Sequence, residues 1–250
     1  DISFDDANAG TRTATASGLS LNGTASGNYV LSNGTAVDSA QILQRGITVS
    51  SFNASDKTYD GTTAASGTFT LSNVVAGDSA DLAVTAASTQ FADEGAGSWM
   101  VTANGLSLSG SAAGNYNLIS SSATDMAAIL QRSVTANFNA NDKVFDGTDT
   151  ASGSFSLGNL IPTDNGAVSI SVSAITFASA QIGTHPVNAT GLSLAGPAAG
   201  NYSLGLSSLS DVAEILPQSL PEDLPSTYEQ TRDGVNIAPI IEDSLVDLGG

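Results

Sequence analysis

The sequence predicts an all-β chain in which small β-sandwich domains follow one another in series. Three observations lead to this prediction: motifs that recur at a long and regular spacing, short runs in which apolar residues alternate with Ser or Thr, and a composition with only 12% charged residues. Alternation with a period of two is typical of half-buried strands. Long helices carry many Glu, Lys and Arg residues on their solvent-facing side, so this composition argues against them.

The repeat is defined by four motifs that occur in the same order along the chain. The interval is 87 residues from Gly18 to Gly105 and 86 residues from Gly105 to Gly191. A period of this length indicates a string of small domains rather than a solenoid of single supersecondary units. The motifs are Gly18-Leu19-Ser20-Leu21, repeated from Gly105 and Gly191; Gly27-Asn28-Tyr29, repeated from Gly114 and Gly200; Ile42-Leu43-Gln44-Arg45, repeated from Ile129 and in part from Ile215; and Lys57-Thr58-Tyr59-Asp60-Gly61-Thr62, matched from Lys143.

Each copy is predicted to form short strands separated by turns. In the second copy the turn chemistry is that of Asp60-Gly61, Ala76-Gly77-Asp78 and Gly110. Short strands at this density predict a small sandwich, of the immunoglobulin-like type. A β-grasp-like arrangement, with residues 125–130 as a short helix, is the alternative. The expected strands are, in order, residues 47–52, 69–71, 82–84, 99–101, 106–108 and 116–118.

The alignment of the copies predicts four segments. Residues 1–44 form the C-terminal half of a first repeat, because Asp1 aligns with Ser88 of the second copy. Residues 45–131 and 132–216 form the second and third repeats. Half a sandwich leaves an open edge and an uncovered apolar face, which is unfavourable. We therefore expect either that the chain was cut from a longer one or that another molecule supplies the missing strands.

The last 34 residues, 217–250, break the repeat. They hold four of the seven prolines and 7 acidic residues against the single Arg232, which predicts an extended acidic linker. Within them, residues 235–241 are apolar enough to form a strand. Such a strand can dock on the last repeat or complete the first repeat of a neighbouring molecule by strand addition.

Charge and cysteine content exclude several classes of function. The chain has 24 acidic and 6 basic residues, a formal net charge of -18, so it repels nucleic acids and anionic membranes. It has no cysteine, which excludes disulfides, thiolate metal sites and a Cys nucleophile. No apolar run has the length of a membrane span, and the first residues do not form a signal peptide. We expect any export signal to lie outside this sequence.

The motifs resemble those of the YDG-type repeat, a module found in tandem in large bacterial surface proteins and filamentous-haemagglutinin-like adhesins. The resemblance rests on the Lys-Tyr-Asp-Gly-Thr segment at Lys57, the Gly77-Asp78 turn, and the Gly-Leu-Ser-Leu and Asn-Tyr motifs, and it covers residues 1–216. The third copy departs from the pattern at Phe145 and at Pro162-Thr163-Asp164. The resemblance implies a secreted stalk or adhesive array, exported through an outer-membrane pore partner.

Two lysines are the first candidates for a structural role. Lys57 and Lys143 are the only lysines, and each lies three residues before an aspartate, Asp60 or Asp146. We expect each Lys to form a salt bridge or hydrogen bond that fixes the turn. The alternative is an intramolecular isopeptide bond to an asparagine such as Asn115 or Asn201.

An Asn-Tyr pair is the second candidate, because it occurs in every copy. We expect the Asn to bond to backbone within its own turn and the Tyr to pack in the core with its hydroxyl satisfied. A ligand role is the alternative. The pairs are Asn28 with Tyr29, Asn115 with Tyr116, and Asn201 with Tyr202.

Catalysis and metal binding have little support in the sequence. His185 is the only histidine, and no nucleophile elbow, phosphate loop or metal-protease motif is present. We therefore predict no enzyme, no catalytic residue and no cofactor. Calcium is the one ion considered, but no loop carries the dense alternating carboxylates of a dedicated calcium site. The weak candidates are Asp5 with Asp6, Asp78 with Asp81, and Asp93 with Glu94.

Two functional hypotheses follow. The first is a non-catalytic segment of an extracellular bacterial surface adhesin, acting as a stalk or as a filament subunit by head-to-tail strand complementation. Its partners are copies of itself, flanking repeats of a longer chain, or a host or matrix surface. The second is a module whose domain-end loops recognise host glycan or matrix protein. Sequence variation around Trp99 and His185 suits recognition, and an exposed Trp99 on a loop favours the second hypothesis.

Overall fold

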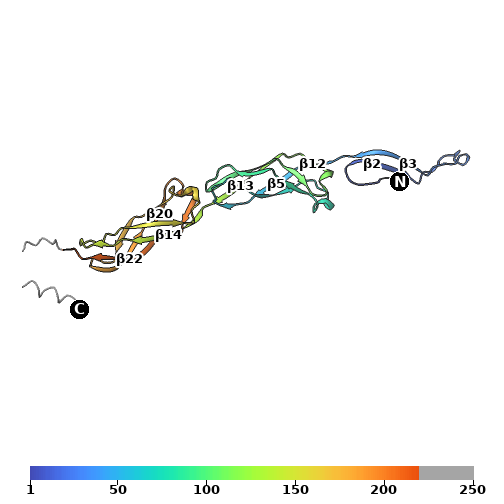
Figure 1. Ribbon diagram of the computed structural model, residues 1–250. Coiled ribbons are helices and arrows are strands. Elements are labelled where there is room, and N and C mark those ends of the chain that lie inside the picture. Colours follow the sequence, from blue (N-terminus) through green and yellow to red (C-terminus); the bar gives the residue numbers. More distant parts are fainter. Residues whose placement is uncertain (220–250) are drawn as a thin grey trace, which may run out of the picture.

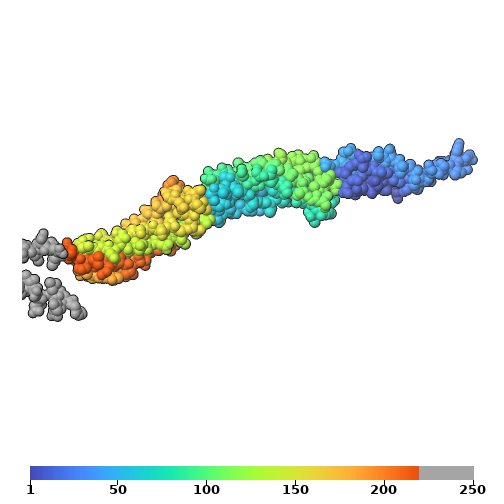
Figure 2. Space-filling model, viewed as in Figure 1, coloured from blue at the N-terminus to red at the C-terminus, as the bar shows by residue number. Residues whose placement is uncertain are grey.

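Three β-rich units follow one another along the axis of a narrow rod in the computed structural model, which describes residues 1–219 (Figure 1). The space-filling view shows the three units in end-to-end contact (Figure 2). Within residues 1–219 the regular structure consists of strands and single-turn 3-10 helices, without an α-helix. The all-β prediction is therefore confirmed. In the same range there is no helix of the length and apolar character that a membrane crossing needs.

The first repeat is a single antiparallel sheet. Its strands are β1 (Ile2–Phe4), β2 (Gly10–Ser17) and β3 (Thr35–Ile42), in the order β1-β2-β3. Between β2 and β3 the chain passes through the 3-10 turn η1 (Ser26–Asn28) at the tip of the rod. No residue of this repeat belongs to the buried apolar core.

The second repeat is a sandwich of four small sheets. The largest has the order β6-β13-β10-β9, in which β13 pairs with β10 along its whole length and with β6 in parallel. The others are β5-β7, β11-β8 and β12-β4. The strands are β4 (Arg45–Ile47), β5 (Val49–Ala54), β6 (Lys57–Thr58), β7 (Gly67–Leu71), β8 (Ala83–Thr85), β9 (Ser88–Phe91), β10 (Gly97–Asn104), β11 (Ser107–Ser109), β12 (Tyr116–Leu118) and β13 (Ser122–Leu130).

The third repeat has the same topology, with one long strand, β14, in place of β4 and β5. β14 pairs with β16 on one side and with β21 in parallel on the other. The main sheet has the order β15-β22-β19-β18. The strands are β14 (Arg132–Ala140), β15 (Lys143–Val144), β16 (Gly153–Gly158), β17 (Ser169–Ser171), β18 (Ala174–Phe177), β19 (Gly183–Thr190), β20 (Ser193–Ala195), β21 (Tyr202–Leu204) and β22 (Ser208–Leu216).

The short helix of the β-grasp alternative is wrong. Residues 125–130 lie in β13, where exposed and less exposed side chains alternate along the strand. Every residue from Ser122 to Ile129 has a partner in β10, from Asn104 to Gly97. A period of two with a continuous antiparallel partner stabilises an extended chain. The sandwich prediction is confirmed.

The backbone conformation explains why the Gly-Leu-Ser-Leu motif begins with glycine in every copy. Gly18, Gly105 and Gly191 have φ values of +67°, +64° and +67°. This left-handed conformation is unfavourable for residues with a Cβ atom, so glycine is the residue that lets the chain turn there.

The core of the second repeat continues into the third. One apolar cluster contains Phe91, Val101 and Ile129 of the second repeat together with Val134 and Tyr202 of the third. The chain also leaves little room between repeats: β3 ends at Ile42 and β4 begins at Arg45, while β13 ends at Leu130 and β14 begins at Arg132. Successive repeats are therefore joined without a flexible linker.

Candidate functional site: the joints between repeats

Two polar contacts at the joint between the second and third repeats involve the Asn201 turn. The Ala96 backbone N–H donates to Oδ1 of Asn201 over 2.9 Å. The side chain of Gln131, the single residue between β13 and β14, donates from Nε2 to the Gly200 carbonyl over 2.9 Å. Asn201 ends the 3-10 turn η5 (Ala199–Asn201), which places its amide at the end of the repeat. We call this pair of contacts the clamp.

The same clamp occurs between the first and second repeats. The Ala9 N–H donates to Oδ1 of Asn115 over 2.8 Å, and Gln44 Nε2 donates to the Gly114 carbonyl over 3.0 Å. Asn115 also donates from Nδ2 to Oδ1 of Asn8 over 2.8 Å. The two joints thus form the same hydrogen bonds between corresponding atoms, although the neighbouring side chains differ. The clamp therefore recurs with the repeat.

The side chains of the two repeated asparagines therefore bond differently from what the sequence predicts. Asn115 and Asn201 bond to the backbone of the preceding repeat, not to backbone within their own turn. Asn28 is exposed, and it makes no such contact within residues 1–219. These contacts are not visible in the sequence, because the bonded positions, Ala9 and Ala96, contribute only main-chain atoms.

Two tyrosines and one aspartate complete the joint between the second and third repeats. Tyr59 and Tyr202 both donate their hydroxyls to Oδ2 of Asp164, over 3.0 and 2.6 Å. Their rings meet edge to face with centroids 5.5 Å apart. Burial and the Asp164 carboxylate raise the pKa of Tyr59 to about 12 and also raise the pKa of Tyr202. The tyrosine of the Tyr-Asp-Gly motif is thus a contact to the next repeat.

Tyr116 makes the equivalent contact within its own repeat. Its hydroxyl donates to Oδ2 of Asp78 over 2.6 Å and accepts the Val75 N–H over 3.1 Å. The hydrogen bond to Asp78, with burial, raises the pKa of Tyr116. Tyr116 and Tyr202 are buried with their hydroxyls satisfied, whereas Tyr29 is exposed.

The loops that donate to Asn115 and Asn201, and the corresponding loop of the third repeat, are each held by a side chain that bonds to a carbonyl four residues before it. Arg12 Nε donates to the Asn8 carbonyl over 2.9 Å, Trp99 Nε1 donates to the Gly95 carbonyl over 2.7 Å, and His185 Nε2 lies 2.9 Å from the Gln181 carbonyl. A carbonyl only accepts, so His185 carries its proton on Nε2. Three residue types share one role because each places an N–H at the same point. In the sequence, the sign of this role is that the aligned positions 12, 99 and 185 all carry a side chain with an N–H group.

Trp99 does not favour the recognition hypothesis. It lies on β10 rather than on a loop, is half-buried, and packs against the apolar core. Its indole N–H is used by the Gly95 carbonyl.

The Lys-x-Tyr-Asp-Gly segment forms a compact turn. Lys57 Nζ bonds to Asp60 Oδ1 over 2.7 Å and to the Thr62 carbonyl over 2.6 Å, and it lies 5.6 Å from the centre of the Phe91 ring. Lys143 repeats this with Asp146, Thr148 and Phe177.

The electrostatics of these turns follow from their hydrogen bonds. Hydrogen bonds from Lys143 and Thr148 lower the pKa of Asp146 to about 2. Burial opposes the shift at Asp60, but bonds from Lys57 and Thr62 lower its pKa as well. Each Lys amine bonds to the Asp three residues on, while the amides of Asn115 and Asn201 bond across the joints. This arrangement lends no support to the isopeptide alternative.

The calcium candidates are not brought together. Within residues 1–219 there is no group of three or more His, Asp or Glu side chains suited to a metal ion. Asp78 accepts from Tyr116, and Asp93 Oδ1 accepts the Gly95 N–H over 2.7 Å. Asp6 plays the same part for Asn8 in the first repeat. Asp81 and Glu94 belong to no such group either.

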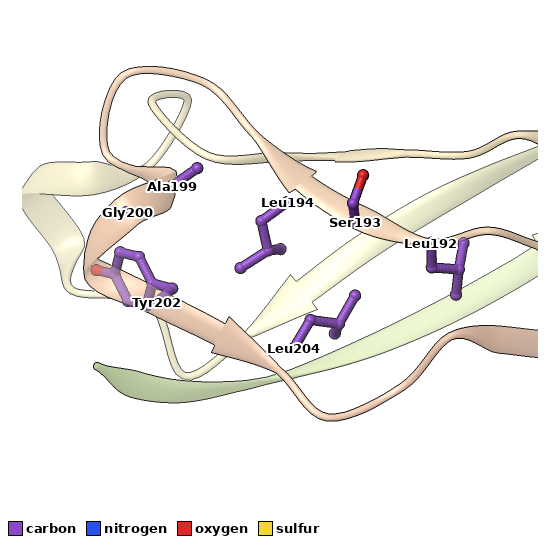
Figure 3. A pocket seen from close by; sticks show the side chains of 7 residues that line it. All are labelled: Leu192, Ser193, Leu194, Ala199, Gly200, Tyr202 and Leu204. Carbon is purple, nitrogen blue, oxygen red and sulfur yellow. The ribbon is translucent and has the colours of Figure 1, made fainter. Parts of the chain in front are cut away.

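A hollow lies beside the joint on the third repeat (Figure 3). Tyr202, Leu194 and Leu204 project into it from the strands around the Gly200 turn. Its lining has no charged side chain. The lining residues are Leu192, Ser193, Leu194, Ala199, Gly200, Tyr202 and Leu204.

The fold and its joints define a tandem array of β-sandwich repeats. The family model of the YDG domain matches residues 44–125 and again residues 131–210. The chain belongs to the YDG domain family. A comparison with curated proteins finds no match.

Proposed function

We propose that the chain is a non-catalytic structural segment, a stalk, of a secreted bacterial surface adhesin. The observation that carries this proposal is the clamp, which occurs with equivalent atoms at both joints. A joint made of fixed contacts sets the angle between repeats, and a fixed angle is what a load-bearing rod needs.

The connection itself supports a stiff rod. Gln131 is the whole link between β13 and β14, and its side chain is part of the clamp. Each clamp hydrogen bond contributes about 0.5–1.5 kcal/mol net. At the second joint the shared apolar cluster and the Tyr59–Asp164 bond add to this. Bending the joint breaks several contacts at once.

Charge and chemistry fit the same role. A net charge of -18 keeps an extended protein soluble and discourages side-by-side aggregation. His185, the only histidine, holds a loop carbonyl. The extracellular location is proposed from the tandem YDG architecture and the lack of cysteine, which suit a protein exported unfolded.

A filament form of this proposal uses strand complementation at the first repeat, whose apolar side chains Phe4 and Tyr29 are exposed. The strand considered as donor, residues 235–241, lies outside the described residues. The alternative function, recognition of host glycan or matrix protein, receives no support from the half-buried Trp99.

The test compares stiffness with and without the clamp. The chain has no cysteine, so a pair of spin labels placed at the exposed Ser98 and Ser171 reports the joint between the second and third repeats. We expect a narrow distance distribution in the wild type and a broad one after Asn201→Ala combined with Gln131→Ala. Asn33→Ala, on the first repeat, is the control. A broad distribution in the wild type contradicts the stalk proposal.

The location has its own test. Antibodies to the purified chain, applied to intact cells of the source organism, are expected to label the surface, and shortening the array by one repeat is expected to bring the label closer to the cell. Label that appears only after cell lysis contradicts the extracellular assignment.

A further inference from the structure

Each clamp has two halves, and the chain contains three copies of both. One half is the donor loop, which presents a backbone N–H; its copies are residues 5–9, 92–96 and 178–182. The other half is the acceptor turn, which presents an asparagine; its copies end at Asn28, Asn115 and Asn201. Two loops and two turns meet inside the chain. The third donor loop lies at the far end of the third repeat, and the Asn28 turn lies at the opposite end of the rod (Figure 1).

The third donor loop is held in the same way as the other two, although its residues differ. Ser179 Oγ accepts the Gln181 N–H over 3.1 Å, as Asp93 does for Gly95. His185 holds the Gln181 carbonyl, as Trp99 holds that of Gly95. The N–H of Ile182 therefore corresponds to the N–H of Ala96. Within residues 1–219 it makes no hydrogen bond.

The surface around this loop is apolar and partly matches the internal joint. Val144, Phe145, Ile182 and Leu216 are all exposed there. Phe145 occupies the position of Tyr59 and so retains an aromatic ring without the hydroxyl. Pro217 replaces Gln131, so this end lacks the glutamine contact. Compared with the joint between the second and third repeats, this end lacks both the glutamine contact and the tyrosine hydroxyl contact, and it keeps the backbone N–H and the aromatic ring.

The Asn28 turn has the geometry of a bound acceptor turn. In η1 the Asn28 N–H bonds to the Ala25 carbonyl over 3.0 Å, and Asn115 and Asn201 make the same bond over 3.0 Å. Tyr29 and Leu21 are exposed beside it. The turn thus presents an amide oxygen and an aromatic ring at the tip of the rod.

We infer that the end of the third repeat binds the Asn28 turn of a second copy of this chain. Ile182 N–H donates to Asn28 Oδ1, and Phe145 packs against Tyr29. The inference rests on the proposed function, because it extends the internal clamp to a contact between molecules. The two surfaces are different and lie at opposite ends, so the contact is heterologous and propagates end to end.

The experiment uses the full chain in analytical ultracentrifugation over a wide concentration range. We expect concentration-dependent end-to-end association of the wild type. Asn28→Ala removes the acceptor, and His185→Phe frees the donor loop while keeping a ring; each is expected to weaken association roughly fivefold to tenfold, the effect of one hydrogen bond. Asn33→Ala is the matched control. His185→Arg is expected to restore association, because Arg12 holds the equivalent carbonyl in the first repeat.

Mixing the two variants tests the two-ended geometry. The Asn28→Ala chain keeps its donor loop and the His185→Phe chain keeps its acceptor turn. A mixture is expected to form one-to-one dimers with wild-type affinity, whose further growth is weakened because both of their free ends carry a substitution. A symmetric contact, in which the same surface of both molecules meets, does not predict this result, because each contact in the mixture would then include a substituted surface.

Three outcomes overturn the inference. They are a wild type that stays monomeric, association that Asn28→Ala leaves unchanged, and association that appears only after residues 220–250 are removed, which makes that segment the occupant. The spin-label pair at Ser98 and Ser171 separates this failure from failure of the stalk proposal. Asn28→Ala and His185→Phe leave that internal distance unchanged, whatever happens between molecules.

Discussion

The first repeat and the two complete repeats contain the same motifs in different surroundings. Phe4 is 46% exposed, whereas its equivalents Phe91 and Phe177 are each 3% exposed. Tyr29 is 71% exposed, whereas Tyr202 is 2% exposed. The strand that carries Phe4, β1, pairs with β2 in the same way as β9, which carries Phe91, pairs with β10. Pairing alone thus forms the sheet, and burial comes from the segment that packs over it.

That segment is the N-terminal half of a repeat, residues 45–85 in the second copy. It supplies β5 and β7, which cover one face of the main sheet, and it receives side-chain hydrogen bonds. Asp125 accepts the Ala54 N–H over 2.9 Å, while Asp38, its equivalent in the first repeat, bonds only to its neighbour Ser39. The comparison shows which interactions belong to the sheet and which to the sandwich.

The largest difference in stability between the first and second repeats is expected when the equivalent phenylalanines, Phe4 and Phe91, are each replaced by alanine. Phe91→Ala removes a buried ring and should lower the free energy of unfolding by about 3–5 kcal/mol. Phe4→Ala, at an exposed position, should change it by less than about 1 kcal/mol. Urea denaturation followed by circular dichroism measures both. Equal effects would mean that the first repeat is covered in solution.

Removing the hydroxyl of Tyr202 or of its equivalent Tyr29 should give a smaller difference in stability between the third and first repeats. Tyr202→Phe leaves the Ile161 N–H without its acceptor and Asp164 with one donor fewer. We expect a loss of about 1–3 kcal/mol. Tyr29→Phe, which removes an exposed hydroxyl, should have no measurable effect. Thermal unfolding of the two variants in parallel checks this, and a stable Tyr202→Phe variant contradicts the proposed hydrogen-bond network.

Acid should lower the stability of the complete repeats, because several of their aspartates have lowered pKa values in the folded state. The folded pKa of Asp146 is about 2, against an ordinary value of about 3.9. Because the folded pKa is lowered, this stabilisation is present above about pH 4 and is lost as the pH falls through about 2. Asp60, Asp125 and Asp211 have lowered pKa values and the same sign. Denaturation midpoints between pH 5 and pH 2 measure the slope, and Asp146→Asn should make it shallower.

Alkali should loosen only the joint that contains Tyr59. Its pKa is raised to about 12 from an ordinary value near 10, so the folded state keeps the proton more tightly. That stabilisation is present below about pH 10 and is lost as the pH rises through about 12. The spin-label distribution across this joint should broaden in that window. Tyr59→Phe should reduce this pH dependence, since only Tyr202 then remains on Asp164. A joint that broadens to the same extent at the same pH without Tyr59 contradicts the assignment.

The fold was predictable where repetition and alternation carried the information. The 87- and 86-residue intervals predicted the tandem sandwiches, and alternation placed several strands. The β-grasp helix is wrong because pairing with β10, a contact distant in the sequence, stabilises residues 125–130 as a strand. Two-residue strands such as β6 carry too few side chains to show a period.

The joints were harder to predict for a physical reason. Asn115 and Asn201 are recognisable as repeated residues, but their partners are main-chain groups of Ala9 and Ala96, which any residue except proline provides. The loop-holding role is shared by Arg12, Trp99 and His185, which look unrelated as letters. A search for an N–H donor at one aligned position would have found it.

Because Gln131 is the whole link between the second and third repeats, the length of the array is set by the number of repeats that it contains. Each repeat carries an acceptor turn at one end and a donor loop at the other, so an added repeat brings its own joint. The length of the protein then changes in whole multiples of one repeat. A gene can therefore tune the length of the protein by duplicating the unit, without any new interface having to arise.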